Sequence, residues 1–371
     1  MAREGSLAAQ DERFMRRALE LARQHFGFTS PNPAVGAVIC KDGRVIGEGS
    51  HRGAGFPHAE IEAMGAALKN GKNLERATLY VTLEPCSTWG RTGPCTEEIL
   101  AHRFKRVVVA ATDPNPAHNG EGLRILRNAG IKVDCGVLER EALELNRCFN
   151  HWITTKRPFV MTKFASTLDG KIATVDGFSK WITGPVARAD AMKLRLECDA
   201  ILVGVNTVLR DDPALTYRGK RSAYKKLRRF VLDPHGRIGL HSQLLKPRKP
   251  ACIVVSEHCP SAIRKRLAKR TTVWVAPSQG GSFNLEWLLQ RMGEEAILGL
   301  LVEGGGEVHA QFLKAKLASL VVLYYAHKLF CGRNAAKAVA GAGLPQPVEI
   351  QHPCWKQLGT ALRLTGIPRF S

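Results

Sequence analysis

The chain has 371 residues, of which 44% are hydrophobic and 23% charged, and its formal net charge is +21. This length exceeds what one hydrophobic core usually holds, so two domains are expected, and the composition is typical of a soluble globular protein. No apolar run is long enough to span a membrane, and residues 1–14 lack the apolar core of a signal peptide. Ten cysteines without a framework-like spacing favour a reducing compartment, so we expect a cytoplasmic protein.

The positive charge is concentrated in the second half. Residues 1–150 contain 20 basic and 18 acidic residues, whereas residues 151–371 contain 34 and 15. The segment 218–229 alone has seven basic residues and no acidic one. Such a run attracts phosphorylated ligands or nucleic acid, or it is simply a solvated loop. We favour the solvated loop, because aromatic residues are not interleaved in the stacking pattern typical of nucleic-acid binding.

Helices and strands alternate in residues 1–150, which predicts a mostly parallel sheet covered by helices on both faces. The periodicity predicts helices at 12–24, 58–68, 96–102, 123–129 and 139–150, and strands at 35–39, 45–47, 79–83, 107–111 and 131–135. Asp42-Gly43 predicts a hairpin turn between the first two strands. Asn32 lies just before the first strand, where it either contacts a ligand or forms a turn between two prolines.

Two short motifs in this half predict a metal site. His58 and Glu60 form a His-x-Glu, and Cys86 follows a proline with Cys95 downstream, which together are the signature of zinc-dependent base deaminases. Three N/S ligands leave the fourth tetrahedral position of Zn²⁺ open for water, whose pKa the metal lowers toward about 7. Glu60 would then carry the proton from the water to the leaving group. The structural alternative is two buried thiols and a surface histidine.

The loop between the two cysteines departs from the short form of the motif. Eight residues separate Cys86 from Cys95, whereas the common form has two. The insertion is rich in Gly and Pro and contains Arg91. Because both its ends would be metal ligands, we expect this loop to touch a substrate.

The composition shifts at 154–158, and a second α/β pattern follows. It predicts strands at 159–164, 201–205, 230–232, 251–255, 272–275, 298–302 and 321–325, and helices at 186–197, with Thr183 as N-cap, and 308–314. The polar segment 206–216 is typical of a binding loop. Glycines 304–306 follow a strand and precede a helix, which indicates either a phosphate site or a tight turn.

These motifs, in this order, resemble those of the bifunctional riboflavin-biosynthesis deaminase–reductases along nearly the whole chain. The resemblance is carried by Asn32-Pro33-x-Val35-Gly36, His58-Ala59-Glu60, Glu84-Pro85-Cys86-Ser87, Gly90-x-Thr92-x-Pro94-Cys95, Ala165-Ser166-x-Leu168-Asp169-Gly170, Ser179-x-Trp181-Ile182-Thr183, Asp211-Asp212-Pro213-x-Leu215-Thr216-x-Arg218 and Glu303-Gly304-Gly305. It implies a cytidine-deaminase-like three-layer α/β/α domain at 1–150 and a dihydrofolate-reductase-like α/β domain at 151–371.

The resemblance also implies two successive reactions. The first is hydrolytic deamination of 2,5-diamino-6-ribosylamino-4(3H)-pyrimidinone 5′-phosphate with Zn²⁺. The second is reduction of the ribosyl group to ribityl by NADPH, with hydride going to C1′ of an opened imine form. The implied partner is therefore a small phosphorylated pyrimidine, with neither nucleic acid nor membrane, and homo-oligomerisation is left open.

Carried over residue by residue, the resemblance assigns a role to each matching position. The zinc ligands are His58, Cys86 and Cys95, the acid–base residue is Glu60, and the deaminase substrate contacts are Asn32, Thr88 and Arg91. In the reductase half, substrate contacts are Lys163, Ser179, Arg195, Leu215, Arg218 and Glu303, and NADPH contacts are Ala165, Trp181, Thr207, Asp211, Gly305 and Gly306.

Two positions depart from the family pattern. Thr88 replaces a usual histidine, so an imidazole contact is missing although a hydroxyl donor is kept, and Pro234 stands where relatives often have Ser. Two alternative functions remain open on the sequence alone. One is a tRNA-type base deaminase with a basic RNA-binding second domain, and the other is a chain in which only the reductase half is active.

Overall fold

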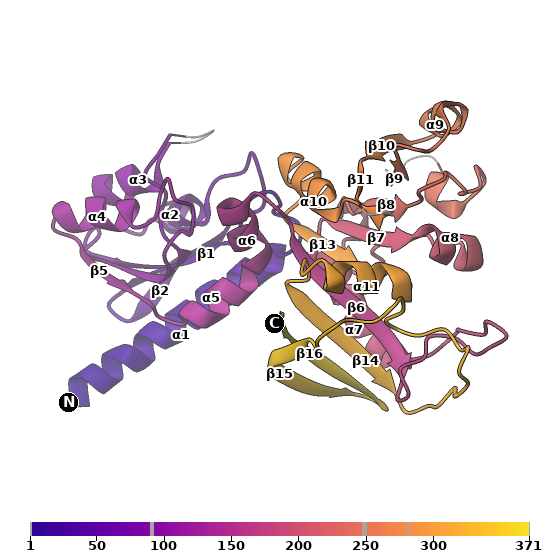
Figure 1. Ribbon diagram of the computed structural model, residues 1–371. Helices are drawn as coiled ribbons and strands as arrows, with labels where there is room; N and C mark the ends of the chain where they lie inside the picture. The colour runs from indigo at the N-terminus through magenta and orange to yellow at the C-terminus, as the bar shows by residue number, and fades with distance from the viewer. Residues whose placement is uncertain (1, 90–92, 247–250, 280–281, 371) are drawn as a thin grey trace. The chain divides into compact units, whose positions relative to one another are not determined.

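The computed structural model describes residues 2–89, 93–246, 251–279 and 282–370 (Figure 1). The chain divides into two compact units, Met1–Lys156 and Arg157–Ser371. Among the described helices, none is both long enough and apolar enough to cross a lipid bilayer.

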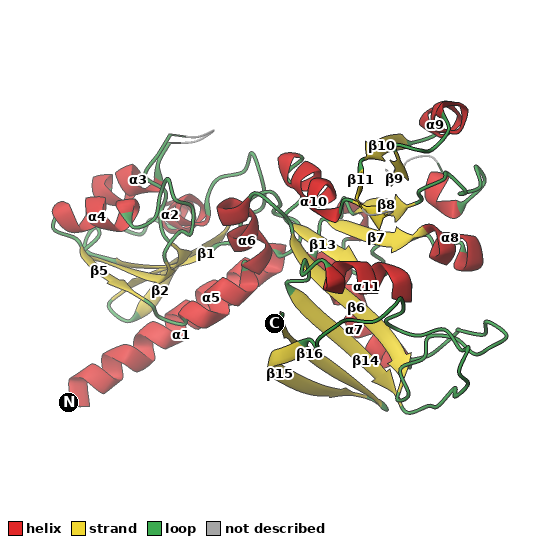
Figure 2. Ribbon diagram, in the orientation of Figure 1, coloured by secondary structure: helices red, strands yellow, loops and turns green. Residues whose placement is uncertain are grey.

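The first unit is a five-stranded sheet between two layers of helices. The strand order is β2-β1-β3-β4-β5, with β3, β4 and β5 parallel and β1 antiparallel to both β2 and β3. Its elements are α1 (Ala2–His25), β1 (Gly36–Lys41), β2 (Arg44–Ser50), α2 (Ala59–Lys69), β3 (Thr78–Leu83), α3 (Cys95–Ala101), β4 (Arg106–Ala111), α4 (Glu121–Asn128), β5 (Lys132–Cys135), α5 (Glu139–Leu145) and α6 (Arg147–Thr155). An apolar core lies on each face of the sheet. One packs α2, α3 and α4 against one face, and the other packs α1 and α5 against the opposite face (Figure 2).

Helix α2 lies unusually close to strand β2. A Cβ atom added at Gly49 would lie 2.3 Å from the carbonyl oxygen of Ala59, so only glycine permits this approach. Ala59 opens α2, and its neighbours His58 and Glu60 are residues of the predicted metal motif. The close packing therefore fixes the start of the helix that carries the motif.

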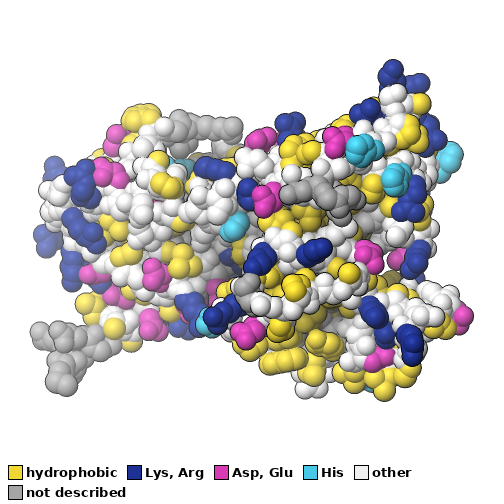
Figure 3. Space-filling model, viewed as in Figure 1, with side chains coloured by type: hydrophobic (Ala, Val, Ile, Leu, Met, Phe, Trp, Pro, Cys, Tyr) yellow, Lys and Arg dark blue, Asp and Glu magenta, His cyan; other side chains and the backbone are white. Residues whose placement is uncertain are grey.

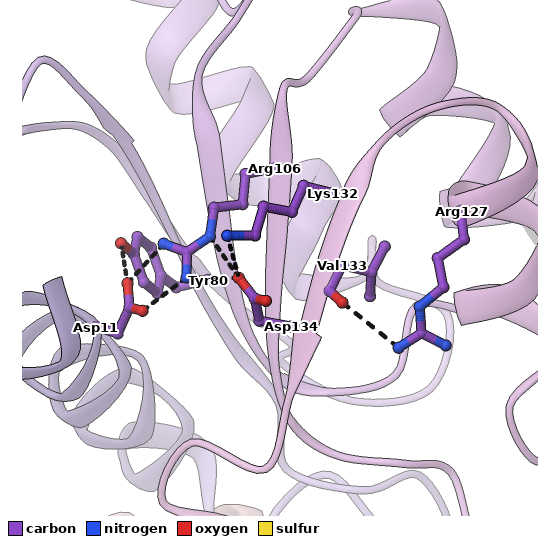
Figure 4. A network of polar contacts seen from close by, with 7 residues as sticks. All are labelled: Asp11, Tyr80, Arg106, Arg127, Lys132, Val133 and Asp134. Carbon is purple, nitrogen blue, oxygen red and sulfur yellow. Dashed lines mark hydrogen bonds and ion pairs between the residues drawn. The ribbon is translucent and has the colours of Figure 1, made fainter. Parts of the chain in front are cut away.

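A buried polar network ties α1 to the sheet (Figure 4). Arg106 of β4 donates two hydrogen bonds to Asp11 of α1, at 2.8 and 2.7 Å, and a third to Asp134 of β5 at 2.6 Å. The hydroxyl of Tyr80 in β3 donates to Asp11 at 2.8 Å. Because every charged group in the network has an opposite partner, burial of the charges is compensated.

The second unit is built on a nine-stranded sheet of order β10-β9-β8-β7-β13-β6-β14-β16-β15. The first seven strands in this order are parallel, and β16 and β15 are antiparallel. Its elements are β6 (Phe159–Thr167), α7 (Pro185–Glu197), β7 (Ala200–Gly204), α8 (Val205–Asp211), η1 (Ser222–Tyr224), β8 (Arg228–Leu232), η2 (Gln243–Leu245), β9 (Ala251–Ser256), α9 (Ser261–Ala268), β10 (Thr272–Ala276), β11 (Ser278–Gln279), β12 (Ser282–Phe283), α10 (Leu285–Glu294), β13 (Gly299–Val302), α11 (Gly306–Lys314), β14 (Leu320–Ala326), β15 (Glu349–Leu358) and β16 (Ala361–Arg369).

Three predictions about local structure are wrong. The helix predicted at 139–150 is two helices, because Asn146 between them hydrogen-bonds both backbone groups of Ala34. The N-cap of α7 is Gly184 rather than Thr183, with Pro185 at the first helical position. The first half of the binding loop predicted at 206–216 is helix α8.

The basic segment 218–229 is not one solvated loop either. Arg229 lies in β8 with only 1% of its surface exposed, and burial lowers its pKa to about 10. Arg228 pairs with Glu295 of the segment that follows α10. Elsewhere on the visible face of this unit, Lys and Arg side chains are dispersed rather than gathered into one stripe (Figure 3).

Candidate active sites

The three predicted metal ligands meet at the start of α2 and α3. Nδ1 of His58 lies 3.4 Å from Sγ of Cys86 and 3.3 Å from Sγ of Cys95, and the three ligand atoms all lie within 4.8 Å of one another. Tetrahedral zinc, with bonds of about 2.0 Å to nitrogen and about 2.3 Å to sulfur, requires N–S separations of about 3.5 Å. The donor types and their spacing therefore fit a zinc ion with one position left open.

Glu60 lies in the first turn of α2, two residues after the histidine. Its side chain is only 4% exposed, and burial, together with the charge of Cys86, raises the pKa of its carboxyl to about 7. The helix N-terminus beside it favours the ionised form and moderates this rise. A carboxyl balanced near neutral pH can both accept and return a proton.

A cavity of about 330 Å³ opens onto the metal cluster. Asn32 lines it together with His58, Glu60 and Cys86, so these predicted residues come together. Thr88 does not: it is exposed and is not among the described residues that line the cavity. Arg91, the remaining predicted contact, falls outside the described residues.

Several cavity residues were missed by the sequence analysis. They are His51, Asp113, Asn115, His118, Phe149 and Trp152. Asp113 and Asn115 follow the carboxyl end of β4, where ligands of parallel sheets commonly bind, and this position is the signal that was available.

The loop that carries Asp113 is held by a buried carboxylate. Glu84 is 5% exposed and accepts backbone N–H bonds from Asp113 (3.0 Å), Gly120 (2.9 Å) and Gly122 (2.9 Å). The backbone N–H of Leu123 donates a fourth bond, at 3.4 Å, so that each carboxylate oxygen of Glu84 accepts two hydrogen bonds. These four bonds satisfy the buried carboxylate.

In the second unit, the predicted substrate residues surround a cavity of about 470 Å³. Its lining includes all six of them, Lys163, Ser179, Arg195, Leu215, Arg218 and Glu303, and five predicted cofactor residues, Ala165, Trp181, Thr207, Asp211 and Gly305. A larger neighbouring cavity of about 1150 Å³ shares Ser179, Thr207, Asp211 and Gly305 with the first and adds Gly306. Two adjoining cavities with shared walls suit two ligands that react with each other.

A buried charge cluster forms one wall of the smaller cavity. Arg195 donates from Nε and Nη2 to the two carboxylate oxygens of Glu303 at 2.9 and 3.0 Å, and Lys163 lies 3.9 Å from the same carboxylate. Burial opposes ionisation of Glu303, but the two cations outweigh it and lower the pKa of this carboxyl to about 2. The cluster keeps one net positive charge, which favours an anionic ligand.

His309 is a further wall residue that the sequence analysis missed. It is 3% exposed, its ring centroid lies 4.0 Å from that of Phe164, and burial beside Lys163 lowers its pKa to about 3. It is therefore neutral at physiological pH.

The three glycines lie where β13 leads into α11. Gly305 is the N-cap of α11, and both Gly305 and Gly306 border the larger cavity. A Cβ added at Gly306 would lie 2.3 Å from the carbonyl oxygen of Lys337, so this residue must be glycine for the backbones to meet. The free N–H groups of the first turn of α11 border the same cavity, which suits a phosphate.

Each of the two units matches a known protein family. The model of the RibD C-terminal domain matches residues 158–367, and that of the cytidine and deoxycytidylate deaminase zinc-binding region matches residues 8–111. The riboflavin biosynthesis protein RibD of Aquifex aeolicus is 45% identical over 86% of this chain and 87% of its own length. RibD of Escherichia coli is 39% identical over 86% of this chain and 88% of its own length.

Two solved structures of such proteins superpose on nearly the whole chain. RibD of Acinetobacter baumannii superposes with a TM-score of 0.85 at 35% identity, covering 98% of this chain and 100% of its own. A diaminohydroxyphosphoribosylaminopyrimidine deaminase/5-amino-6-(5-phosphoribosylamino)uracil reductase from Thermotoga maritima gives 0.84 at 36% identity, covering 98% and 99%.

The fold and the two sites thus define an enzyme that combines a zinc-binding deaminase with a reductase. The chain belongs to the RibD family and is a bifunctional deaminase–reductase of riboflavin biosynthesis that uses Zn²⁺ and NADPH. This membership confirms the fold class, the family resemblance and the pair of activities expected from the sequence.

Proposed function

We propose that the unit Met1–Lys156 deaminates 2,5-diamino-6-ribosylamino-4(3H)-pyrimidinone 5′-phosphate and that the unit Arg157–Ser371 reduces the ribosyl group of the product. The main support for the deaminase half is the His58–Cys86–Cys95 cluster, which borders a cavity that Glu60 also lines. The name of the Thermotoga maritima relative supplies the substrate class.

In the deaminase, the zinc ion held by His58, Cys86 and Cys95 supplies, when bound, a Lewis acid that makes water a nucleophile near neutral pH. Glu60 takes a proton from the attacking water and delivers it to the ring nitrogen. It then takes the second proton, from the hydroxyl of the addition product, and delivers it to the amine, which leaves as ammonia while the carbonyl forms. Its burial keeps this proton transfer away from bulk water. Asn32, on the cavity wall, orients the pyrimidine.

In the reductase, NADPH supplies the hydride and binds in the larger cavity along Thr207, Gly305 and Gly306. Lys163, Arg195 and Arg218 bind the phosphorylated sugar in the smaller cavity, where the charge cluster keeps an excess of positive charge. Glu303 holds Arg195 by a two-point hydrogen bond and so fixes the direction of its remaining donors.

A coupled assay tests this proposal. Zinc-loaded protein is supplied with the diaminopyrimidine phosphate and NADPH, and ammonia release and NADPH oxidation are followed separately. We expect both signals, with NADPH oxidation appearing only after deamination has begun. NADPH oxidation that requires externally deaminated substrate would show that only the reductase half is active, and the absence of both signals would refute the proposal.

A further inference from the structure

His51 lies in the deaminase cavity beside Asn32, although neither the zinc motif nor the predicted contacts include it. It directly follows β2, and its side chain is almost fully buried, with 4% exposed. Its Nδ1 lies 2.9 Å from the carbonyl oxygen of Pro57, and its Nε2 lies 2.9 Å from Nδ2 of Asn32. The ring also meets that of His58 edge to face, at 5.4 Å between centroids.

These two contacts determine where the proton of the ring lies. A carbonyl oxygen can only accept, so Nδ1 of His51 must donate to Pro57. A second proton on Nε2 would bury a charged imidazolium against an amide, which is costly without a carboxylate partner. Nε2 of His51 is therefore an acceptor, and only the NH₂ group of Asn32 can donate to it.

The orientation of the Asn32 amide follows. Nδ2 of Asn32 donates a hydrogen bond to His51, while its Oδ1 has no hydrogen bond within the described part of the chain. Asn32 also lines the cavity. Asn32 thus presents a hydrogen-bond acceptor to the ligand. Without His51, the amide could turn over and present a donor at the same place, because the two ends of the group are nearly isosteric.

We propose that His51 is a positioning residue of the deaminase, which holds Asn32 with its Oδ1 toward the cavity to accept a hydrogen bond from an N–H or O–H group of the substrate. This inference rests on the proposed deaminase function. The backbone carbonyl of Pro57 fixes the tautomer of His51, and Nε2 of His51 fixes the orientation of the Asn32 amide. Asn32 then contacts the substrate. A ligand that offers an acceptor at this point would leave Oδ1 unpaired and would be rejected.

The test is a double-mutant cycle on zinc-loaded full-length protein, using H51A, N32A and H51A/N32A. H51A alone should lower the kcat/KM of deamination about tenfold or more, with much of the loss in KM. In the N32A background, the same change should lower it less than about twofold, because the residue through which His51 acts is already gone. H51Q keeps one donor and one acceptor and should restore part of the loss.

Three controls separate positioning from damage. Zinc content and reductase activity on pre-deaminated substrate should remain at wild-type levels in every variant. H102A, which changes a histidine at the C-terminal end of α3, should leave deamination unchanged. Loss of zinc in H51A, or an equal loss of kcat/KM in both backgrounds, would overturn the proposal in favour of metal support or a direct substrate contact.

A spectroscopic measurement tests the proposal independently of turnover. Long-range ¹H–¹⁵N spectra of the wild-type protein should show His51 with a protonated Nδ1 and an unprotonated Nε2. The opposite tautomer, or an imidazolium, would overturn the proposal even in a fully active enzyme. A wild-type chain that does not deaminate but shows the expected tautomer would count against the proposed function and not against the positioning of Asn32.

Discussion

Two buried glutamates, one in each unit, have opposite electrostatic surroundings. Glu60 is 4% exposed and burial raises its pKa to about 7, whereas Glu303, with a side chain 11% exposed, has its pKa lowered to about 2 by Arg195 and Lys163. The residue type and the degree of burial are similar, so the neighbouring charges determine the difference. Glu60 can therefore exchange protons near neutral pH, while Glu303 stays ionised and orients cations.

The two sites also differ in what holds them together. The deaminase site depends on three ligand atoms, from the starts of α2 and α3 and from the segment that follows β3, and loss of one ligand is expected to remove the metal. The reductase site is a set of side chains spread from β6 to α11, with the charge cluster in one wall. We therefore expect single changes to be more damaging in the first site than in the second.

The largest effect is expected from C86S. A serine hydroxyl is a poor zinc ligand, so zinc content should fall and deamination should drop more than about 10³-fold. Reductase activity on deaminated substrate should be unchanged. Metal analysis and ammonia release are the measurements, and C135S, which alters an exposed thiol of the same unit, is the matched control. Deamination that survives without zinc would show that the cluster is structural.

The next largest effect is expected from E303Q, which should change the stability of the second unit at acid pH. Because the pKa of Glu303 is lowered from 4.5 to about 2, its ionised form stabilises the folded state above pH 4.5, and this contribution is lost as the pH falls through about 2. A shift of this size corresponds to about 3 kcal/mol. E303Q should lack this part of the pH dependence.

Hydrogen exchange of peptides from β6 and β13, followed by mass spectrometry between pH 5 and pH 2, isolates this unit from the other. Wild-type protection should fall with the pH, and E303Q should start lower and change less. E286Q, in the first turn of α10, should behave like the wild type. If E303Q kept the wild-type pH profile, Glu303 would not be the group responsible.

A smaller effect is expected from G306A. The added Cβ would lie 2.3 Å from the carbonyl oxygen of Lys337, so the start of α11 must move away from its neighbour. We expect NADPH affinity to fall about tenfold, the loss of roughly one charge-assisted hydrogen bond. Fluorescence titration with NADPH measures it, with G239A as the control, since a Cβ there meets open space. Unchanged affinity would place the cofactor phosphates elsewhere.

The smallest effect is expected from T88H, which introduces the histidine that the family resemblance led us to expect at this position. Thr88 is exposed and does not line the described cavity, so kcat/KM of deamination should change less than about threefold. Steady-state ammonia release is the measurement. A tenfold gain would mean that the loop after Cys86 reaches the substrate and that the native threonine has weakened the enzyme.

Sequence reasoning could single out the three residues that cluster in the structure, because the chemistry of a metal site lies in short motifs. His58 and Glu60 share one helix turn, and thiolate, imidazole and carboxylate are recognisable as residue types. His51 and Asp113 were missed because their part in the cavity depends on how β2 and β4 end in space. Neither residue type is distinctive by itself.

The fold shows the same limit. Strongly apolar strands such as β7 and β13 were predicted within one residue, since buried parallel strands form continuous apolar runs. Strands β15 and β16 were not predicted, because most of β15 is exposed and its sequence shows no alternation. The break between α5 and α6 depends on Asn146 bonding Ala34, a contact 112 residues apart that no local pattern reveals.

One chain holds two active sites, and we propose that Glu60 carries the protons in the first. The most direct test is E60Q, assayed for zinc content, ammonia release and NADPH oxidation beside E62Q, a matched change on the same helix. In E60Q we expect full zinc content, a loss of deamination of about 10²- to 10⁴-fold and normal NADPH oxidation on deaminated substrate, and we expect E62Q to behave like the wild type. Wild-type ammonia release by E60Q, or loss of both activities together, would contradict this proposal.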